Sequence, residues 1–380
     1  MMSLLQECHM SSYIFYGSKV EFQKKIPPNH RTLTELVMEL DVSKMLVQIE
    51  GQEHKNNSVE KVKVENFVAG SQEYAGVREH VILNFANFLA KMDVKNIYLH
   101  NPPRQISEQI KRLFPNTIVE AQEYKSVTEE TINVINENYN EIVIGQSGVK
   151  TQLLKALLPL TLNDREKPVV MLFYGSSGIG KTETANFIST CLEENIFRKQ
   201  FSMFQNNQFS TYLFGGAHYE KSFAKDLLDR ESNVILLDEF DKAHPTFHCA
   251  FYQLFDEGIF EDQNYIVQLK KSVIICTSNY KNDDEIRKEL GDAIFNRFDV
   301  VIGFNELSND AKLKIAESSI IETKMKYKQE KNMEMAEQYL DNLKASAVKC
   351  RNAREIHHLV SDTFALYYIN KYVVMNTNVT

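Results

Sequence analysis

The residues whose types and spacing most clearly predict chemistry are the eight from Gly175 to Thr182, which match the pattern G-x-x-x-x-G-K-[ST] in full. An apolar run, residues 169–174, precedes them, and a helical pattern over residues 183–191 follows. The backbone N–H groups of such a loop surround a phosphate, and the helix N-terminus adds about half a positive charge. The motif's lysine reaches the β- and γ-phosphates, and its last hydroxyl binds Mg²⁺. We therefore predict a nucleotide and Mg²⁺ site formed by Gly175, Ser176, Ser177, Gly178, Ile179, Gly180, Lys181 and Thr182.

Two acidic residues, Asp238 and Glu239, follow four apolar residues, 234–237. Such a run is typical of a strand covered on both faces of a parallel sheet, and ligands of these sheets bind at the carboxyl ends of the strands. We expect Asp238 to bind Mg²⁺, directly or through water, and Glu239 to be the base that polarises the attacking water. Acids after a strand can also cap a helix. The phosphate-binding loop upstream favours the catalytic interpretation.

Three more polar residues are candidates only because of where they stand in the order of elements. Apolar residues 273–276 end in Thr277-Ser278-Asn279. If the three apolar runs lie in one sheet, Asn279 is placed to orient the water or to contact the γ-phosphate, although alone it is an ordinary turn residue. Arg297 and Arg354, further along the chain, would by default be surface arginines.

The order of these motifs resembles that of the AAA+ ATPases, and most closely the Clp group of protein unfoldases and disaggregases. Ile144-Gly145-Gln146 is similar to the segment of that family that contacts adenine. Residues 238–245 are close to the Asp-Glu-x-x-Lys-Ala-His-Pro run of the second Clp ATPase ring, and residues 255–258 and 275–279 continue the match. The resemblance covers about residues 140–360.

The resemblance implies an ATP-hydrolysing machine that uses Mg²⁺ and remodels or unfolds proteins or complexes. It implies that Ile144 and Gly145 contact adenine and that Asn279 is a first sensor of the γ-phosphate. Arg354 resembles the second sensor, from the lid domain. Arg297 resembles a finger that reaches the nucleotide of a neighbouring subunit, so the protein is expected to form a ring with itself, as a hexamer in the family.

One stretch departs from the Clp pattern. Clp unfoldases grip a threaded polypeptide with a Gly-aromatic-Val-Gly pore loop, whereas the corresponding residues here, 214–223, lack that sequence and reach Asp238 in fewer residues. Tyr219 could serve as the pore aromatic, or it could pack at the start of a helix. Torsin-like relatives also lack the pore motif. The alternative function is an ATP-gated sensor or scaffold that regulates a partner without threading a substrate.

The expected fold class is α/β, with an AAA+ P-loop NTPase core built on a parallel sheet, a small helical lid domain and a separate N-terminal α/β domain. We predict an N-terminal recognition domain (1–125), a connecting helix (126–141), a large ATPase domain (142–304) and a lid (305–380). Apolar spacing predicts strands at 45–49, 96–100 and 117–120 and helices at 74–92 and 105–114. Residues 51–58 read as an exposed loop. Lid helices are expected at 310–326, 333–349 and 353–368, and residues 372–375 could add a short strand or help subunits associate.

Composition limits the remaining classes of function. The 380 residues carry a formal net charge of −8, which argues against a nonspecific nucleic-acid binder. The five cysteines lack metal or disulfide spacing, as expected of a protein from a reducing compartment such as the cytoplasm. No stretch approaches 18 apolar residues, so we expect no membrane association. Protein partners are expected to bind through residues 1–125, because Clp proteins place adaptor- or substrate-binding domains ahead of the ring.

Overall fold

The computed structural model describes residues 11–49, 61–203 and 208–374. The chain divides into two compact units, and each is discontinuous in sequence. Unit 1 contains residues 1–125, 204–231 and 257–269, and unit 2 contains residues 126–203, 232–256 and 270–380. The predicted segments are contiguous, so the compact units cut across the predicted large ATPase domain, 142–304.

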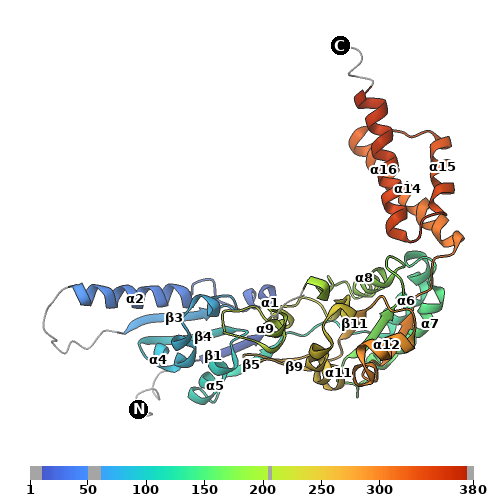
Figure 1. Cartoon of the computed structure of the whole chain (residues 1–380). Coiled ribbons are helices and arrows are strands. Elements are labelled where there is room, and N and C mark those ends of the chain that lie inside the picture. Colours follow the sequence, from blue (N-terminus) through green and yellow to red (C-terminus); the bar gives the residue numbers. More distant parts are fainter. Residues whose placement is uncertain (1–10, 50–60, 204–207, 375–380) are drawn as a thin grey trace. The chain divides into compact units, whose positions relative to one another are not determined.

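Unit 1 is built on a five-stranded parallel sheet with the strand order β2-β3-β4-β1-β5 (Figure 1). Its strands are β1 (Ser11–Tyr16), β2 (Arg31–Thr32), β3 (Val62–Ala69), β4 (Met92–His100) and β5 (Ile118–Ala121). The helices are α1 (Lys19–Gln23), α2 (Leu33–Ile49), α3 (Glu79–Leu83), α4 (Phe85–Leu89) and α5 (Arg104–Leu113). The later segments of the chain contribute α9 (Gln208–Phe214), α10 (Phe223–Leu228) and the antiparallel hairpin of β9 (Ile259–Glu261) and β10 (Ile266–Gln268).

Two elements of unit 1 differ from the sequence-based expectation. Residues 45–49, predicted as a strand, are the end of helix α2. Thr32 and Glu35 form reciprocal hydrogen bonds at the start of this helix, and neither Gly nor Pro interrupts it before Gly51, so the helix outlasts the short alternating pattern. The helix predicted over residues 74–92 is divided into α3 and α4 at Asn84, and Met92 already begins β4. The loop predicted at 51–58 lies outside the described residues.

Unit 2 contains a second five-stranded parallel sheet, with the order β12-β6-β11-β8-β7. Its strands are β6 (Val169–Tyr174), β7 (Phe197–Gln200), β8 (Val234–Asp238), β11 (Val273–Thr277) and β12 (Val300–Gly303). All five residues of β8 and of β11 are buried, which confirms the prediction of central strands covered on both faces.

Helices pack around this sheet and continue into a helical region at the end of the chain (Figure 1). The helices are α6 (Glu129–Ile142), α7 (Ser147–Leu157), α8 (Lys181–Cys191), α11 (Tyr252–Glu257), α12 (Asp283–Leu290) and α13 (Asp292–Phe295), followed by the lid helices α14 (Asn309–Lys331), α15 (Glu337–Ala347) and α16 (Ala353–Tyr368). The possible strand at residues 372–375 is not found in its described part, residues 372–374. Instead, α16 continues without a break into a π-helical turn, Ile369–Val374. Met375 lies outside the described residues.

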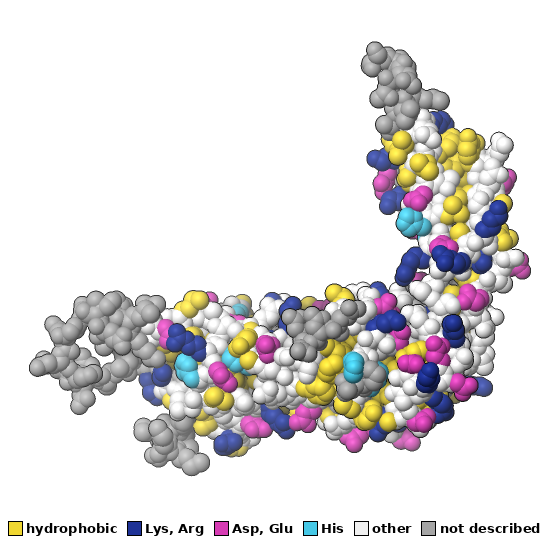
Figure 2. Space-filling model, in the orientation of Figure 1, with side chains coloured by type: hydrophobic (Ala, Val, Ile, Leu, Met, Phe, Trp, Pro, Cys, Tyr) yellow, Lys and Arg dark blue, Asp and Glu magenta, His cyan; other side chains and the backbone are white. Residues whose placement is uncertain are grey.

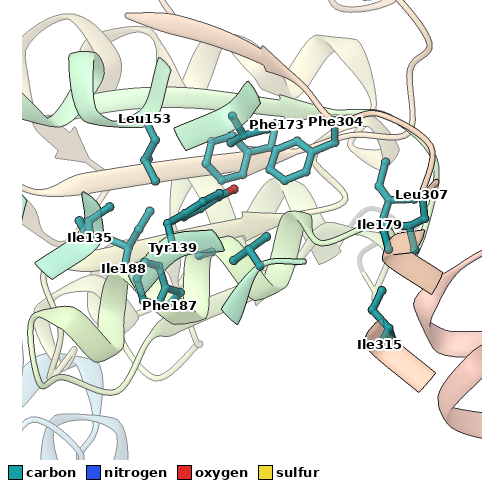
Figure 3. Close-up of a cluster of buried hydrophobic side chains, with 14 of the residues drawn as sticks. Ile135, Tyr139, Leu153, Phe173, Ile179, Phe187, Ile188, Phe304, Leu307 and Ile315 are labelled. Atoms are coloured by element: carbon teal, nitrogen blue, oxygen red, sulfur yellow. The ribbon is translucent and has the colours of Figure 1, made fainter. Parts of the chain in front are cut away.

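An apolar cluster joins the sheet of unit 2 to helices of that unit and to the lid. Figure 3 shows Tyr139 of α6 lying among Ile135, Phe187 and Ile188, with Phe173 and Phe304 beyond it. The Tyr139 hydroxyl lies 3.2 Å from the Thr184 hydroxyl of α8, so the buried ring keeps a polar partner. The cluster fixes the helix that follows the phosphate-binding loop against the sheet. Within the described ranges, no helix has the length and apolar content needed to cross a bilayer.

Candidate nucleotide-binding and catalytic site

The carboxyl ends of β6, β8 and β11 lie side by side in the sheet of unit 2. Chain segments that follow these strands border a cavity of about 760 Å³. The cavity brings together most of the predicted site residues, from the loop, from the strand ends and from lid helix α16. Those that line it are Ile144, Ser177, Gly178, Ile179, Gly180, Lys181, Thr182, Asp238, Glu239, Asn279 and Arg354.

The three glycines of the phosphate-binding loop adopt backbone angles that other residues rarely reach. The φ angles of Gly175, Gly178 and Gly180 are 130°, 74° and 116°. A Cβ at Gly175 would lie 2.7 Å from the carbonyl oxygen of Phe304, and one at Gly178 would lie 3.0 Å from the Asn352 side chain. The loop therefore depends on glycine for its conformation and for the close approach of its neighbours.

Lys181 is a buried cation at the start of α8, with 8% of its surface exposed. Its Nζ donates to the carbonyl oxygen of Ser176 at 2.8 Å and to Oδ1 of Asn279 at 3.3 Å. Burial lowers the pKa of Lys181 to about 8, against the raising effect of nearby carboxylates, of which Asp241 is the strongest. A phosphate would supply the negative charge that favours the ammonium form at this position.

Asp238 ends β8 with a carboxylate that is already hydrogen-bonded on both oxygens. The Thr277 hydroxyl donates to Oδ1 at 2.5 Å, and Arg198 donates to Oδ2. Asp238 and the hydroxyl residue Thr182 line the same cavity beside the phosphate-binding loop. One carboxylate and one hydroxyl fit Mg²⁺, which takes hard oxygen ligands and is usually bound by one or two carboxylates together with substrate phosphates.

Glu239 has an unusual backbone conformation for a residue other than glycine, with φ 56° and ψ 44°. Its N–H donates to the Thr277 hydroxyl at 2.9 Å, and its carboxylate accepts from Nε2 of Gln200 at 3.0 Å. Hydrogen bonds from Ser202 and then Gln200 lower the pKa of Glu239, so the side chain is ionised near neutral pH. Strained backbone that is held by several contacts is common at functional sites.

The lid contributes to the cavity through the start of α16. Asn352 caps this helix, because its side chain accepts from the N–H of Glu355 at 3.0 Å. The next residue, Ala353, donates its N–H to the carbonyl oxygen of Gly178 at 2.9 Å. Arg354 is exposed and lines the cavity. The backbone of the lid is thus hydrogen-bonded to the phosphate-binding loop itself.

The segment predicted to contact adenine lies between the loop and the lid. Ile144 lines the cavity. Gly145 has a φ angle of 86°, and a Cβ at this position would lie only 2.8 Å from the Cβ of Ala311 in α14, so only glycine fits. The buried amide of Gln146 donates to the carbonyl oxygens of Ile179 at 3.0 Å and Asn305 at 2.8 Å. Gln146 therefore ties this segment to the phosphate-binding loop and to the start of the lid.

The comparison with protein families agrees with this geometry. Residues 166–345 match the family described as AAA domain (Cdc48 subfamily). Residues 166–345 are an AAA+ ATPase domain of the Clp type. Similar proteins are the AAA+ ATPase ClpV1 of Pseudomonas aeruginosa (30% identity over 40% of this chain and 18% of that protein), the chaperone protein ClpB of Mycoplasma genitalium (30%, 42% and 25%) and the mitochondrial disaggregase of Homo sapiens (33%, 38% and 23%). The chain thus spans at most about a quarter of the length of these relatives.

Four predicted site residues are not among those that line the cavity: Gly145, Gly175, Ser176 and Arg297. Gly145 and Ser176 adjoin residues that do line it, and Gly175 directly precedes Ser176, whereas Arg297 adjoins none. Arg297 follows α13, where its Nε donates to Oδ2 of Asp256 at 2.8 Å and its Nη1 donates to the carbonyl oxygen of Ala293 at 2.6 Å. Its guanidinium lies over the Tyr252 ring, 4.1 Å from the centroid. These contacts hold the arginine away from the cavity of its own chain.

Three residues of the Clp-type ATPase domain were not singled out from the sequence, although they contact the acidic pair. Arg198 and Gln200 come from β7, a strand of one apolar and three polar residues that gives no apolar run to recognise. Their place beside β8 is a matter of tertiary pairing. Thr277 could have been found, because it ends the apolar run of β11 next to Asp238 and carries a hydroxyl.

Proposed function

We propose that the protein binds ATP with Mg²⁺ in the cavity of unit 2 and hydrolyses it. The observation that supports this most is the convergence of Lys181, Asp238, Glu239 and Asn279 on one cavity. Lys181 and the loop N–H groups hold the phosphates, Thr182 and Asp238 hold Mg²⁺, and Glu239 orients and polarises the attacking water. Mg²⁺, when bound, neutralises charge that develops on the phosphates. Asn279 and Arg354 contact the γ-phosphate from the sheet and from the lid.

We further propose that Arg297 completes the site of a neighbouring copy, so that activity requires a ring, a hexamer as in Clp proteins. Its support is that Arg297 is held away from its own cavity by Asp256 and Tyr252. A finger supplied in trans is worth about 10³ to 10⁵ in rate in related phosphate-loop enzymes. The lid has exposed apolar side chains that suit contact between copies, among them Ile321, Met325, Tyr339 and Leu366. Figure 2 shows apolar side chains on one face of the lid.

The test is ATP turnover per protomer over a wide range of protein concentration. We expect a cooperative rise in the natural protein, and loss of that rise in Arg297→Ala with ATP binding retained. Arg287→Ala is the matched control, because Arg287 also pairs with an aspartate and lies over an aromatic ring. Mixing Arg297→Ala with Lys181→Ala should restore part of the activity, since each variant supplies the group that the other lacks.

A turnover rate per protomer that does not change with concentration, and is unaffected by Arg297→Ala, would show that the site is complete within one chain. Absence of ATP binding in the natural protein would overturn the whole proposal. Binding without turnover at any concentration would instead support a partner-completed, ATP-gated scaffold.

We propose that hydrolysis drives the remodelling of a protein or complex that the N-terminal region recognises. The relatives named a chaperone and a disaggregase support this class of substrate. The four described cysteines, Cys191, Cys249, Cys276 and Cys350, form no disulfide bond, which suits a reducing compartment such as the cytoplasm.

A second candidate is an ATP-gated switch that does not thread its substrate. The burial of His218 within residues 214–223 favours this candidate, whereas the adjacent Tyr219, which is 61% exposed, is the side chain that could grip a substrate. Tyr219→Ala separates the two candidates in an assay of ATP-dependent unfolding of a folded reporter protein. Loss of unfolding with ATPase activity intact would support threading by this residue, and unchanged activity would support the switch.

A further inference from the structure

Two segments that interrupt the ATPase domain in sequence belong to unit 1, together with the N-terminal sheet. We call their described parts, residues 208–231 and 257–269, the insert segments. They pack against each other: the N–H of Gln263 donates to the carbonyl oxygen of Phe214 at 3.1 Å, and Asn264 donates to that of Gly216 at 2.9 Å. The rings of Phe223 and Phe260 meet edge to face with centroids 4.9 Å apart. The insert segments therefore form one packed structure.

The same structure is fixed to the N-terminal region at separate points. His218, 7% exposed, donates from Nε2 to the carbonyl oxygen of Val77 at 2.9 Å. The N–H of Arg104 donates to the carbonyl oxygen of Asn264 at 2.8 Å, and its guanidinium pairs with Glu261 at 2.7 Å. Contacts to both insert segments leave residues 214–223 held in place, which is a poor property for a loop that must grip and release a moving chain.

A further contact of the insert segments lies at the carboxyl edge of the N-terminal sheet. Asp229, just after α10, accepts from Nδ2 of Asn101 at 2.6 Å and from the Ser71 hydroxyl at 3.4 Å. The ring of His100 is stacked on Phe22 at 4.6 Å and has its Nε2 3.9 Å from the Asp229 carboxylate. Asn101 is fully buried with a φ angle of 44°, a conformation that few residues adopt. Its Nδ2 also donates to the carbonyl oxygen of Gly17 at 2.8 Å, so one buried amide joins the chain after β1 to the Asp229 carboxylate.

The position of Asp229 is the one that a ligand occupies in many open parallel sheets. Ligands of such sheets bind outside the carboxyl ends of adjacent strands whose connections leave in opposite directions. Strands β4 and β1 are neighbours of this kind, because β1 continues to β2 on one side and β4 continues to β5 on the other. A side chain from the insert segments therefore takes the ligand position of the N-terminal sheet.

The chain connects Asp229 closely to the catalytic acids. The first insert segment begins after β7, whose Gln200 is hydrogen-bonded to Glu239, and ends shortly before β8, which carries Asp238. We propose that the insert segments are a fixed strut that transmits the nucleotide state of the cavity to the N-terminal sheet through Asp229, and that they do not grip a threaded polypeptide. This inference rests on the proposed binding of ATP.

Amide hydrogen exchange of the full-length protein, with and without a nonhydrolysable ATP analogue and Mg²⁺, tests the strut. We expect the analogue to slow exchange in the phosphate-binding loop and also around residues 70–71 and 100–101, by about threefold or more. In Asp229→Ala the loop should remain protected while the response of the N-terminal peptides is lost. Glu231→Ala, which removes an exposed carboxylate nearby, should keep both responses.

The outcomes separate the strut from the proposed function. A protected loop with unchanged N-terminal peptides in the natural protein overturns the strut and leaves ATP binding standing, whereas an unprotected loop overturns both. An N-terminal response that survives Asp229→Ala also overturns the strut. If that variant does not fold, Asp229→Asn, which keeps the size of the side chain but leaves one oxygen in place of the two that accept from Asn101 and Ser71, takes its place with a reduced response of the N-terminal peptides expected.

Discussion

At the scale of single residues, Glu239 shows how neighbours prepare a side chain for its role. Its left-handed backbone and its hydrogen bonds to Gln200 and Thr277 fix the carboxylate at the end of β8. Because hydrogen bonds from Ser202 and Gln200 lower the pKa of Glu239, the side chain is ionised and needs no proton exchange before it can accept a hydrogen bond from water. Its contribution to the reaction is therefore orientation and polarisation.

Glu239→Gln should retain ATP binding and lower the turnover number by about 10²- to 10⁴-fold, the usual range for loss of a general base. Glutamine keeps the size of the side chain but removes its charge. Glu306→Gln is the matched control; it lies near the loop, as an acceptor for Ser176, without lining the cavity. Steady-state turnover and equilibrium ATP binding measure the two properties, and unchanged turnover in Glu239→Gln would remove it from the base position.

His248 provides a prediction about stability and pH. It is 2% exposed and stacks on the Phe240 ring at 5.0 Å, and burial lowers its pKa to about 4. The folded protein therefore binds fewer protons here than the unfolded chain, in which histidine titrates near pH 6.5. The stability contribution is complete above that pH and is lost as the pH falls toward 4, up to about 3 kcal/mol in total.

His248→Phe keeps an aromatic ring on Phe240 and removes the titration. Between pH 7.5 and pH 5, the natural protein should lose about 2 kcal/mol more unfolding free energy than this variant does. Denaturant unfolding at the two pH values measures the difference. Equal losses in both proteins would mean that His248 is protonated inside the fold.

Site residues could be predicted from the sequence where they belong to a motif of fixed spacing. They could not be predicted where only the pairing of strands in the folded protein brings them to the site. The phosphate-binding loop and the Asp238-Glu239 pair could be recognised because each directly follows an apolar run that predicts a buried strand. Arg198 and Gln200 give no such signal, since β7 is short and polar and gains its place only by pairing with β8.

At the scale of elements, the lid and the phosphate-binding loop depend on one helix cap. Asn352 both caps α16 and lies against Gly178, so its loss should loosen the helix start that carries Arg354. We expect Asn352→Ala to cost about 1 kcal/mol of stability and to weaken ATP binding. Ser308→Ala, which removes the cap of α14, should cost a similar amount of stability with ATP binding unchanged. Thermal unfolding and nucleotide titration compare the two, and equal ATP affinities in both would argue against the link.

The elements themselves were predictable where apolar runs were long or strongly patterned, as in β6, β8, β11 and α16. The wrong strand predictions concern short patterns that directly follow a longer helix in the sequence. Residues 45–49 alternate like a strand, but a capped helix reaches them from Leu33. Residues 369–374 follow α16 without Gly or Pro, so helical structure continues.

At the scale of the whole molecule, the sequence did not indicate that the compact units would be discontinuous. Hydrophobic periodicity marks elements, but it carries no information on which sheet an intervening segment joins. We expect a chain of residues 126–380 to unfold at a lower temperature than the full protein and to bind more of a hydrophobic dye, because Phe223 and Val267 would lose the unit in which they are buried. Equal unfolding temperatures would mean that the insert segments are stable alone.

The discontinuity of unit 1 also has a consequence for synthesis on the ribosome. Asn101 meets Asp229 only after 128 further residues have been made. At ordinary elongation rates this is a delay of about 10 s, during which the carboxyl edge of the N-terminal sheet has no carboxylate from its own chain. The nascent N-terminal region is therefore exposed to other binders for longer than its length suggests, and its final state is reached only once the ATPase strands are being translated.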